Sequence, residues 1–477
     1  MKCGEKTYPA ILTLLLALTA LTWWLHVPGA SVDVVKDSVP TPSPLGVAFG
    51  SFYRGETFMD LIEELTIHST KIYLYRWQIE REKGEYDWEI VDRFLGQLGP
   101  GEGSLIAVWS SSHRGTRENG QMKKGAPPED RDAYYDFIFN LVRHCRGKIE
   151  YWQNDCEPNS PRFWEGTKEE FVSTLEVFHR AVKAADPAAT VVVGGHSGIF
   201  TDNGIPDNQP FFDHIFRKAR DSFDLFDIRL YGDPYTIPYR VEWFQRRMAE
   251  LDCLKPIVCT EYGGPLPTQF PEGRELRRKY FDNRSRDEQL AMFKHLMNNR
   301  YLLPDQMRMF LEGCEGELEE KRHRIHCRDV VTRTVIALSS GVRKLWYWDL
   351  VNDPHPLFGK FRLVDRDFER RYPAFYAYQR MARAMRDATA VKRRAIRDRP
   401  NMYLFEIGRT DRDPLYVVWE KRDLFAGEDD PPTEIELALG FEKVRMTDVF
   451  GTEERKETDG GLLLLGLTDT PLFIEGN

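Results

Sequence analysis

The sequence lacks the surplus of basic residues that nucleic-acid-binding proteins usually carry. Lysine and arginine together number 66 against 75 aspartates and glutamates, which leaves a formal net charge of -9 at pH 7. The sequence also has no glycine-rich loop of the kind that cradles phosphate groups. Both absences argue against a nucleic-acid partner. We also expect no cofactor.

Long apolar runs are absent with one exception, near the N-terminus. Lys2 and Lys6 precede an apolar run at residues 10–25, which is the arrangement of an export signal. The run is long for a cleaved signal and short for a membrane span, so residues 1–30 are either a signal peptide or an N-terminal membrane anchor. No cysteine follows the run, which argues against lipid attachment, and the proline-rich residues 31–44 form a stiff linker. We therefore expect a secreted, periplasmic or membrane-anchored protein whose folded part lies outside the cytoplasm.

The rest of the sequence contains ample core-forming material, since 42% of all residues are hydrophobic and 30% are charged. Short β-branched and aromatic runs alternate with longer amphipathic stretches, which is typical of βαβ units around a parallel sheet. The predicted strands are residues 46–50, 71–76, 104–110, 149–154, 190–195, 226–231, 256–261 and 344–349. Eight strands predict an α/β fold, a (β/α)8 or TIM barrel, over residues 45–389.

Amphipathic periodicity predicts helices between the strands, and the pattern changes after the barrel. The clearest helices are residues 128–145, 168–185 and 328–340. Residues 274–321 are too long for one crossover, so they are expected to add helices before the last one. Beyond residue 390 short strands with turn signals follow at 402–407, 415–419, 434–439 and 472–475. They predict a small antiparallel β-sandwich over residues 390–477, without a catalytic cluster of its own.

Two glutamates stand at the C-terminal ends of predicted strands, where barrels of this kind carry their chemistry. Glu157 precedes Pro158 just after the fourth strand, and Glu261 ends the seventh strand. With this pair the sequence resembles the clan of retaining (β/α)8-barrel glycoside hydrolases, whose acid/base follows strand four in an Asn-Glu-Pro motif and whose nucleophile ends strand seven. It looks most like the β-xylosidase-like members of glycoside hydrolase family 39, which carry a C-terminal β-sandwich.

The resemblance implies a two-carboxylate mechanism on an oligosaccharide or polysaccharide. Glu261 would attack the anomeric carbon, and Glu157 would protonate the leaving oxygen from about 5 Å away. Strands four and seven lie across the barrel mouth and can present the two groups from opposite sides of a sugar. Two other functions remain open at this point: a catalytically silent carbohydrate-binding barrel, and transglycosylation by the same residues.

The resemblance also implies residues that contact the substrate or the nucleophile. Arg76, at the end of strand two, corresponds to a residue that supports the nucleophile, and Tyr231 corresponds to one that hydrogen-bonds it. Trp346 and Trp348 correspond to the tryptophan that floors the sugar subsite. The other candidates for substrate contact are Trp109, Asn154, Asn159 and His196. For any one of the tryptophans, packing in the core is an equal alternative.

The sequence departs from the family pattern at two positions. Cys156 stands where the family has an asparagine that donates a hydrogen bond to the sugar 2-hydroxyl, and a thiol is a weak donor. Either Asn154 or Asn159 takes over this task, or the sugar has an altered 2-position, or hydrolysis has been lost. We favour the altered 2-position, because cysteine leaves more room than asparagine. Arg229 stands where relatives often have a histidine.

Seven cysteines leave open a disulfide and a metal site. Cys145 and Cys156 flank strand four at opposite ends, which is too far for a disulfide. Cys259 stands two residues before Glu261 on the same predicted strand, so its side chain is expected to point to the same side, into the barrel. Only Cys314 and Cys327 look able to pair. The group Cys314, His323, His326 and Cys327 fits no common zinc-ligand spacing, so no metal site is expected.

Overall fold

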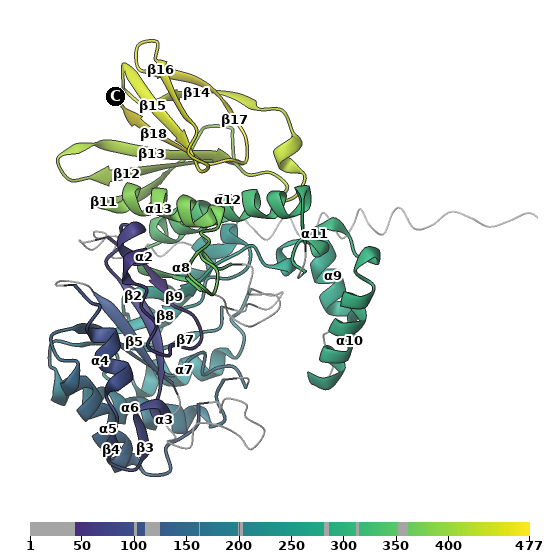
Figure 1. Ribbon diagram of the computed structural model, residues 1–477. Helices are drawn as coiled ribbons and strands as arrows, with labels where there is room; N and C mark the ends of the chain where they lie inside the picture. The colour runs from purple at the N-terminus through teal and green to yellow at the C-terminus, as the bar shows by residue number, and fades with distance from the viewer. Residues whose placement is uncertain are drawn as a thin grey trace, which may run out of the picture. The chain divides into compact units, whose positions relative to one another are not determined.

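The computed structural model of the protein describes residues 43–99, 103–109, 125–161, 163–198, 200, 204–280, 286–311, 314–351 and 361–477 (Figure 1). The expected signal peptide or anchor at residues 1–30 lies outside these ranges, as does most of the expected linker. In the ranges that are described, no helix is both long and apolar enough to cross a membrane.

Eight parallel strands close into a barrel, which confirms the predicted fold class. They are β1 (Leu45–Ala48), β2 (Thr70–Tyr75), β5 (Ser104–Trp109), β6 (Ile149–Asn154), β7 (Thr190–His196), β8 (Leu225–Ile228), β9 (Ile257–Tyr262) and β10 (Val342–Trp348). Their order around the barrel follows the chain, and β10 pairs with β1 to close it. The short hairpin β3 (Glu80–Glu82) and β4 (Glu85–Tyr86) after β2 has no counterpart among the predicted strands.

Alternation along the strands divides the apolar side chains into two layers. Tyr73, Val192 and Val258 belong to a cluster inside the barrel. Their sequence neighbours Ile72 and Val191 belong to the larger cluster between the strands and the outer helices. The barrel is therefore a packed core, and its chemistry is confined to the rim.

Helices surround the barrel and fill the long segment before the last strand. They are α2 (Met59–Glu64), α3 (Arg76–Ile79), α4 (Glu89–Leu95), α5 (Arg131–His144), α6 (Lys168–Ala185), α7 (Gln209–Lys218), α8 (Ile237–Glu250), α9 (Pro271–Tyr280), α10 (Arg286–Asn298), α11 (Asp305–Arg308), α12 (Glu317–Ser339) and α13 (Pro373–Met385). Extra helices in residues 274–321 were expected, and α9, α10 and α11 are there. Helix α12 begins eleven residues before the predicted 328, because its first turns are polar and lack an apolar stripe.

A register irregularity overturns the expectation for Cys259. The pairing of β9 with β10 shifts between Leu345 and Tyr347, opposite the end of β9. As a result Cys259 packs in the outer cluster, while both Thr260 and Glu261 contact Lys71 inside the barrel. An irregularity of this kind re-aims side chains that strict alternation would send outward.

The disulfide between Cys314 and Cys327 that the sequence left open is not formed. Cys327 is buried in the core between the barrel and its helices, whereas Cys314 borders a separate cluster around Phe270 and Phe310. The histidines between them have other neighbours. The Nε2 atom of His326 lies 2.6 Å from the Tyr347 hydroxyl, and that of His323 lies 3.6 Å from Glu319 Oε1.

The C-terminal strands form an antiparallel sandwich, drawn in green to yellow in Figure 1. The strands are β11 (Ala388–Arg394), β12 (Met402–Arg409), β13 (Arg412–Glu420), β14 (Thr433–Ala438), β15 (Lys443–Asp448), β16 (Glu453–Glu457), β17 (Leu462–Leu467) and β18 (Leu472–Gly476). A six-stranded sheet in the order β11-β12-β13-β18-β15-β16 shares one apolar core with the pair β14-β17.

Glu428, in the short 3-10 helix Gly427–Asp429 before β14, ties the sandwich to helix α12. Its carboxylate accepts hydrogen bonds from Arg324 at 3.0 Å and Arg328 at 2.9 Å, and Lys321 lies 3.2 Å away. Partial burial alone would raise the pKa of Glu428, but the hydrogen bonds and charges of these cations lower it to about 2. A folded-state pKa below the ordinary value means that this contact stabilises the fold above about pH 4.3 and is lost as the pH falls toward 2.

We predict that Glu428→Gln lowers the free energy of unfolding by about 2 kcal/mol at pH 7, because charge-assisted hydrogen bonds are lost. Urea unfolding between pH 7 and pH 3 measures it, and the difference from wild type should shrink as the pH falls. Asp429→Asn is the matched control, since Asp429 is largely exposed and contacts only Lys321 among the described cations. A difference independent of pH would contradict the role of this carboxylate.

Candidate active site

Glu261, near the end of β9, lies between two buried cations. Lys71 on β2 places its Nζ atom 3.0 Å from Glu261 Oε1, and Arg229, just after β8, places Nη2 3.2 Å from the same oxygen. The Tyr73 hydroxyl donates a hydrogen bond to this oxygen as well. Burial alone would raise the pKa of Glu261, but Arg229, Lys71 and Tyr73 together lower it. The carboxylate is therefore charged and fixed in position at neutral pH.

A buried polar layer supports the two cations from below. Asp227 accepts hydrogen bonds from Arg229, from the Thr260 hydroxyl at 2.7 Å and from Gln153 Nε2 at 2.6 Å. The side chain of Asp227 is fully buried. Burial lowers the pKa of Lys71, and the charge of Glu261 acts against this shift. When Lys71 is protonated, Lys71 and Arg229 balance Asp227 and Glu261 in charge, which offsets the cost of burying four ions in the barrel.

Glu157 approaches the same point from the other side of the barrel mouth, in the turn after β6. It has a φ angle of 39°, in the left-handed region that residues other than glycine rarely adopt. Asn159 holds this turn, because its Nδ2 atom donates to Ser197 Oγ at 3.0 Å and its Oδ1 atom accepts from the Ser197 amide at 3.2 Å. The side chain of Glu157 is 14% exposed, so it borders solvent, and Arg229 Nε lies 3.5 Å from its Oε1.

The two carboxylates are close enough to act on one bond. An oxygen of Glu157 and one of Glu261 lie within 4.8 Å of each other. This separation matches the roughly 5 Å of retaining glycoside hydrolases and falls short of the roughly 6.5–9.5 Å that admits a water in inverting ones. The arrangement can therefore supply a charged nucleophile and a solvent-bordering proton donor.

Cys156 lies between these carboxylates and the buried cations. Its Sγ atom is 3.3 Å from both the Tyr73 hydroxyl and Arg229 Nη2. Burial raises the pKa of the Cys156 thiol to about 12, so the thiol is neutral at pH 7. Cys156, Glu157 and Glu261 also place one potential metal-ligand atom each within 4.8 Å. Arg229 and Lys71 already lie at hydrogen-bonding distance from Glu261, and their positive charges disfavour a further cation there.

Arg76 does not support the nucleophile, contrary to expectation. It begins helix α3 beyond the end of β2, and it pairs with Glu80 and donates to the Ala133 carbonyl at 3.3 Å. Lys71, deeper on the same strand, takes the expected position beside Glu261. The sequence indicates this position of Lys71. Lys71, Tyr73 and Tyr75 stand at every second position of one strand, so their side chains point to the same side, the barrel interior.

Three of the expected contact residues do gather around the carboxylates. Tyr231 donates a hydrogen bond to Glu261 Oε2 at 3.3 Å, as expected. Trp348 and Trp109 both pack on the ring of Tyr73, with centroid distances of 6.1 and 5.3 Å. Trp109 is half-buried at the end of β5, which leaves part of its ring accessible.

Other expected contact residues are structural. His196 is fully buried against Phe212 and Phe244, and burial lowers its pKa to about 3, so it is a neutral core residue. Trp346 is fully buried one layer below Trp348, and its indole donates to Ser69 Oγ at 3.0 Å. Neither side chain can stack on a sugar.

Of the two asparagines near Cys156, Asn159 differs from expectation. Both polar atoms of the Asn159 side chain are used by Ser197, so Asn159 cannot replace the missing hydrogen-bond donor without breaking the turn. Asn154 is buried at the end of β6, and its Oδ1 accepts from the Gly194 amide at 3.4 Å. Its Nδ2 atom makes no hydrogen bond within the described ranges.

Solved structures of glycoside hydrolases share this fold. A family 39 glycoside hydrolase from Bacteroides cellulosilyticus WH2 superposes with a TM-score of 0.62 at 16% identity, over 91% of this chain and 81% of that one. A monomeric β-xylosidase from Caulobacter crescentus CB15 has a TM-score of 0.57 at 14% identity, over 92% and 97%. A family 51 α-L-arabinofuranosidase from Bifidobacterium longum has a TM-score of 0.53 at 14% identity, over 92% and 96%.

No family model and no curated protein matches the sequence. At these low identities the solved structures establish the architecture, a (β/α)8 barrel followed by a β-sandwich. The resemblance to the family 39 barrels that the two glutamate motifs indicated is therefore confirmed at the level of fold.

We predict that Lys71→Met raises the pKa of Glu261, because an opposite charge at hydrogen-bonding distance is removed while burial remains. A 13C NMR titration of carboxyl-labelled glutamate measures the shift, with Glu261→Gln to assign the resonance. Lys168→Met, which removes a partly exposed lysine at the start of α6, is the control. An unchanged Glu261 pKa in Lys71→Met would show that Arg229 alone holds the charge.

Proposed function

We propose that the protein is a retaining glycoside hydrolase that cleaves an oligosaccharide or polysaccharide by double displacement. The observation that carries this proposal is the pair Glu157 and Glu261, within 4.8 Å of each other at the barrel mouth. Glu261 is held charged for attack on the anomeric carbon, and Glu157 borders solvent, where a leaving group departs. The glycosidase activities named for the solved relatives support the same chemistry.

In the first step Glu261 forms a bond to the anomeric carbon while Glu157 gives its proton to the departing oxygen. In the second step Glu157, now ionised, takes a proton from water, which displaces Glu261 and restores both carboxyls. Tyr231 donates a hydrogen bond to Glu261 Oε2, leaving Oε1 to Lys71 and Arg229. Both oxygens of the nucleophile are thus oriented before substrate binds.

We further propose that this reaction takes place outside the cytoplasm. The support is the N-terminal sequence, in which Lys2 and Lys6 precede the apolar run at residues 10–25. Fractionation of host cells that express the protein tests this proposal, which expects the protein in the membrane, periplasmic or extracellular fraction. Recovery from the cytoplasm alone would contradict it.

A silent carbohydrate-binding barrel is the second candidate, because one observation favours it. The Cys156 thiol replaces the asparagine of the family pattern, and its sulfur lies 3.3 Å from both the Tyr73 hydroxyl and Arg229 Nη2. A weak donor at this point removes a hydrogen bond that would strengthen in the transition state. Glycan binding by wild type without turnover of any substrate would favour this candidate.

We predict that Glu157→Ala slows hydrolysis of phenyl glycosides by about 100- to 10,000-fold, because their leaving group needs a proton. Dinitrophenyl glycosides, whose leaving group departs unprotonated, should form the glycosyl-enzyme at nearly the wild-type rate. Steady-state and burst kinetics on both substrates measure this. Glu261→Gln is the comparison variant and should lose turnover on both substrates, since an amide cannot form the ester. Equal losses on both substrates in Glu157→Ala would remove Glu157 from the acid/base role.

We predict that Cys156→Asn lowers kcat/KM on 2-acetamido glycosides by about tenfold, because the larger side chain takes up space next to the sugar 2-position. Paired nitrophenyl glycosides with a 2-hydroxyl or a 2-acetamido group measure the preference. Cys156→Ser is the matched control and keeps the small size. Wild-type activity restricted to 2-hydroxy sugars, and raised by Cys156→Asn, would refute the altered 2-position.

A further inference from the structure

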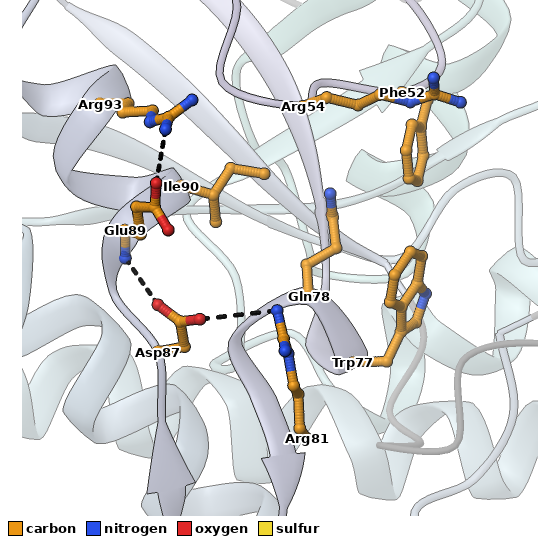
Figure 2. A pocket seen from close by; sticks show the side chains of 9 residues that line it. All are labelled: Phe52, Arg54, Trp77, Gln78, Arg81, Asp87, Glu89, Ile90 and Arg93. Atoms are coloured by element: carbon orange, nitrogen blue, oxygen red, sulfur yellow. Dashed lines mark hydrogen bonds and ion pairs between the residues drawn. The ribbon is translucent and has the colours of Figure 1, made fainter.

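A second cavity opens beside the barrel mouth, next to the ends of β1 and β2 (Figure 2). Its volume of about 480 Å³ lies in the usual range of small-molecule sites. Phe52, from the loop after β1, and Trp77, in α3 directly after β2, form one wall. Residues of α4 and of the loop before it form the facing wall. The catalytic carboxylates do not line this cavity.

A row of aromatic rings, in which Tyr73 and Tyr75 are buried, lies between this cavity and Glu261. Tyr73, Tyr75 and Trp77 follow one another at every second position. The ring of Trp109 lies 5.3 Å from that of Tyr73 and stacks on that of Tyr75 at 5.4 Å. Tyr75 in turn lies 6.0 Å from Trp77. Because Tyr73 hydrogen-bonds Glu261, the row runs from the cleavage point to the cavity.

The wall of the cavity nearest this row is suited to a sugar ring. Phe52 and Trp77 lie nearly parallel, with centroids 5.8 Å apart and an interplanar angle of 20°. Both rings are half-buried, so each keeps an accessible surface. Flat aromatic surfaces beside polar groups bind ligands that have both an apolar face and hydroxyl groups, as a sugar has.

The charges around the cavity favour an acidic ligand. Arg81 lies 3.7 Å from Asp87, and Arg93 pairs with Glu89, so these two cations are already balanced. Arg54 is exposed, and its guanidinium lies 4.9 Å from the centroid of Phe52. Within the described ranges no carboxylate pairs with the Arg54 guanidinium, because the Glu56 carboxylate accepts from the Arg54 backbone amide at 2.6 Å and not from its side chain. A guanidinium binds carboxylates and sulfates through paired hydrogen bonds.

We propose that this cavity is a distal subsite that binds an acidic residue, carboxylated or sulfated, of the glycan cleaved at Glu157 and Glu261. The proposal rests on the proposed function, because it places the distal residue on the same glycan. Trp77 and Phe52 bind the sugar ring, and Arg54 binds its acidic group. The substrate class is then an anionic glycan of several residues, since the row of rings separates the two sites.

An array of neutral, uronic-acid and sulfated oligosaccharides, probed with the Glu261→Gln variant, tests the subsite without turnover. We expect binding to acidic glycans and at least a tenfold weaker affinity in Glu261→Gln/Arg54→Gln. Trp77→Ala in the same background should weaken binding by about tenfold. Arg246→Gln is the control, because it removes an exposed arginine of α8 away from the cavity. Binding confined to uronic-acid or to sulfated members identifies which acidic group is recognised.

The outcomes separate this proposal from the proposed function. Preference for neutral glycans, binding unaffected by Arg54→Gln, or no binding across the array would each overturn the subsite. Hydrolysis of small aryl glycosides by the wild-type protein is read out independently, because these substrates do not reach the cavity. Binding that depends on Arg54, without any hydrolysis, would support the subsite and refute the hydrolase function. Hydrolysis without binding of acidic glycans would support the hydrolase function and refute the subsite.

Discussion

The ion pair of Glu261 with Lys71 and Arg229 is the interaction on which the site depends. A carboxylate inside a barrel core loses its hydration, and only cations at hydrogen-bonding distance keep it charged. Those cations need a counter-charge of their own, which Asp227 supplies from the neighbouring strand. Lys71, Arg229 and Asp227 are therefore charged side chains that hold the carboxylate of Glu261 in place. Packing of the barrel core alone does not require this arrangement.

The ends of β6 and β9 fix the position of Glu261 relative to Glu157. Glu261 belongs to β9, and Glu157 follows β6 in a turn that Asn159 fastens to Ser197 after β7. Because strands and hydrogen bonds hold both residues, the carboxylates of Glu157 and Glu261 keep the separation that a double displacement needs. The left-handed backbone at Glu157 is maintained by these contacts, and it aims the side chain at the mouth.

The sequence was sufficient for the architecture and for the two glutamates, because strand alternation and strand-end positions are local signals. It was insufficient for positions whose side-chain contacts depend on packing between distant parts of the chain. Lys71 shares a strand with Arg76, and only the barrel closure shows which of the two reaches Glu261. The buried positions of His196 and Trp346 and the shifted register beside Cys259 likewise depend on neighbouring strands. Strands β11, β15 and β16 each contain at least three charged residues, so they carry little strand signal of their own, and β17 is a run of leucines without polar alternation.

The stereochemistry of the first product tests the central claim most directly, since it depends on the separation of Glu157 and Glu261 and on nothing remote. Proton NMR during early hydrolysis of an aryl glycoside distinguishes the two anomers before mutarotation. A separation within 4.8 Å predicts that the first sugar released has the anomeric configuration of the substrate. Release of the opposite anomer would contradict the account, because it requires a water between the carboxylates in place of a covalent bond to Glu261.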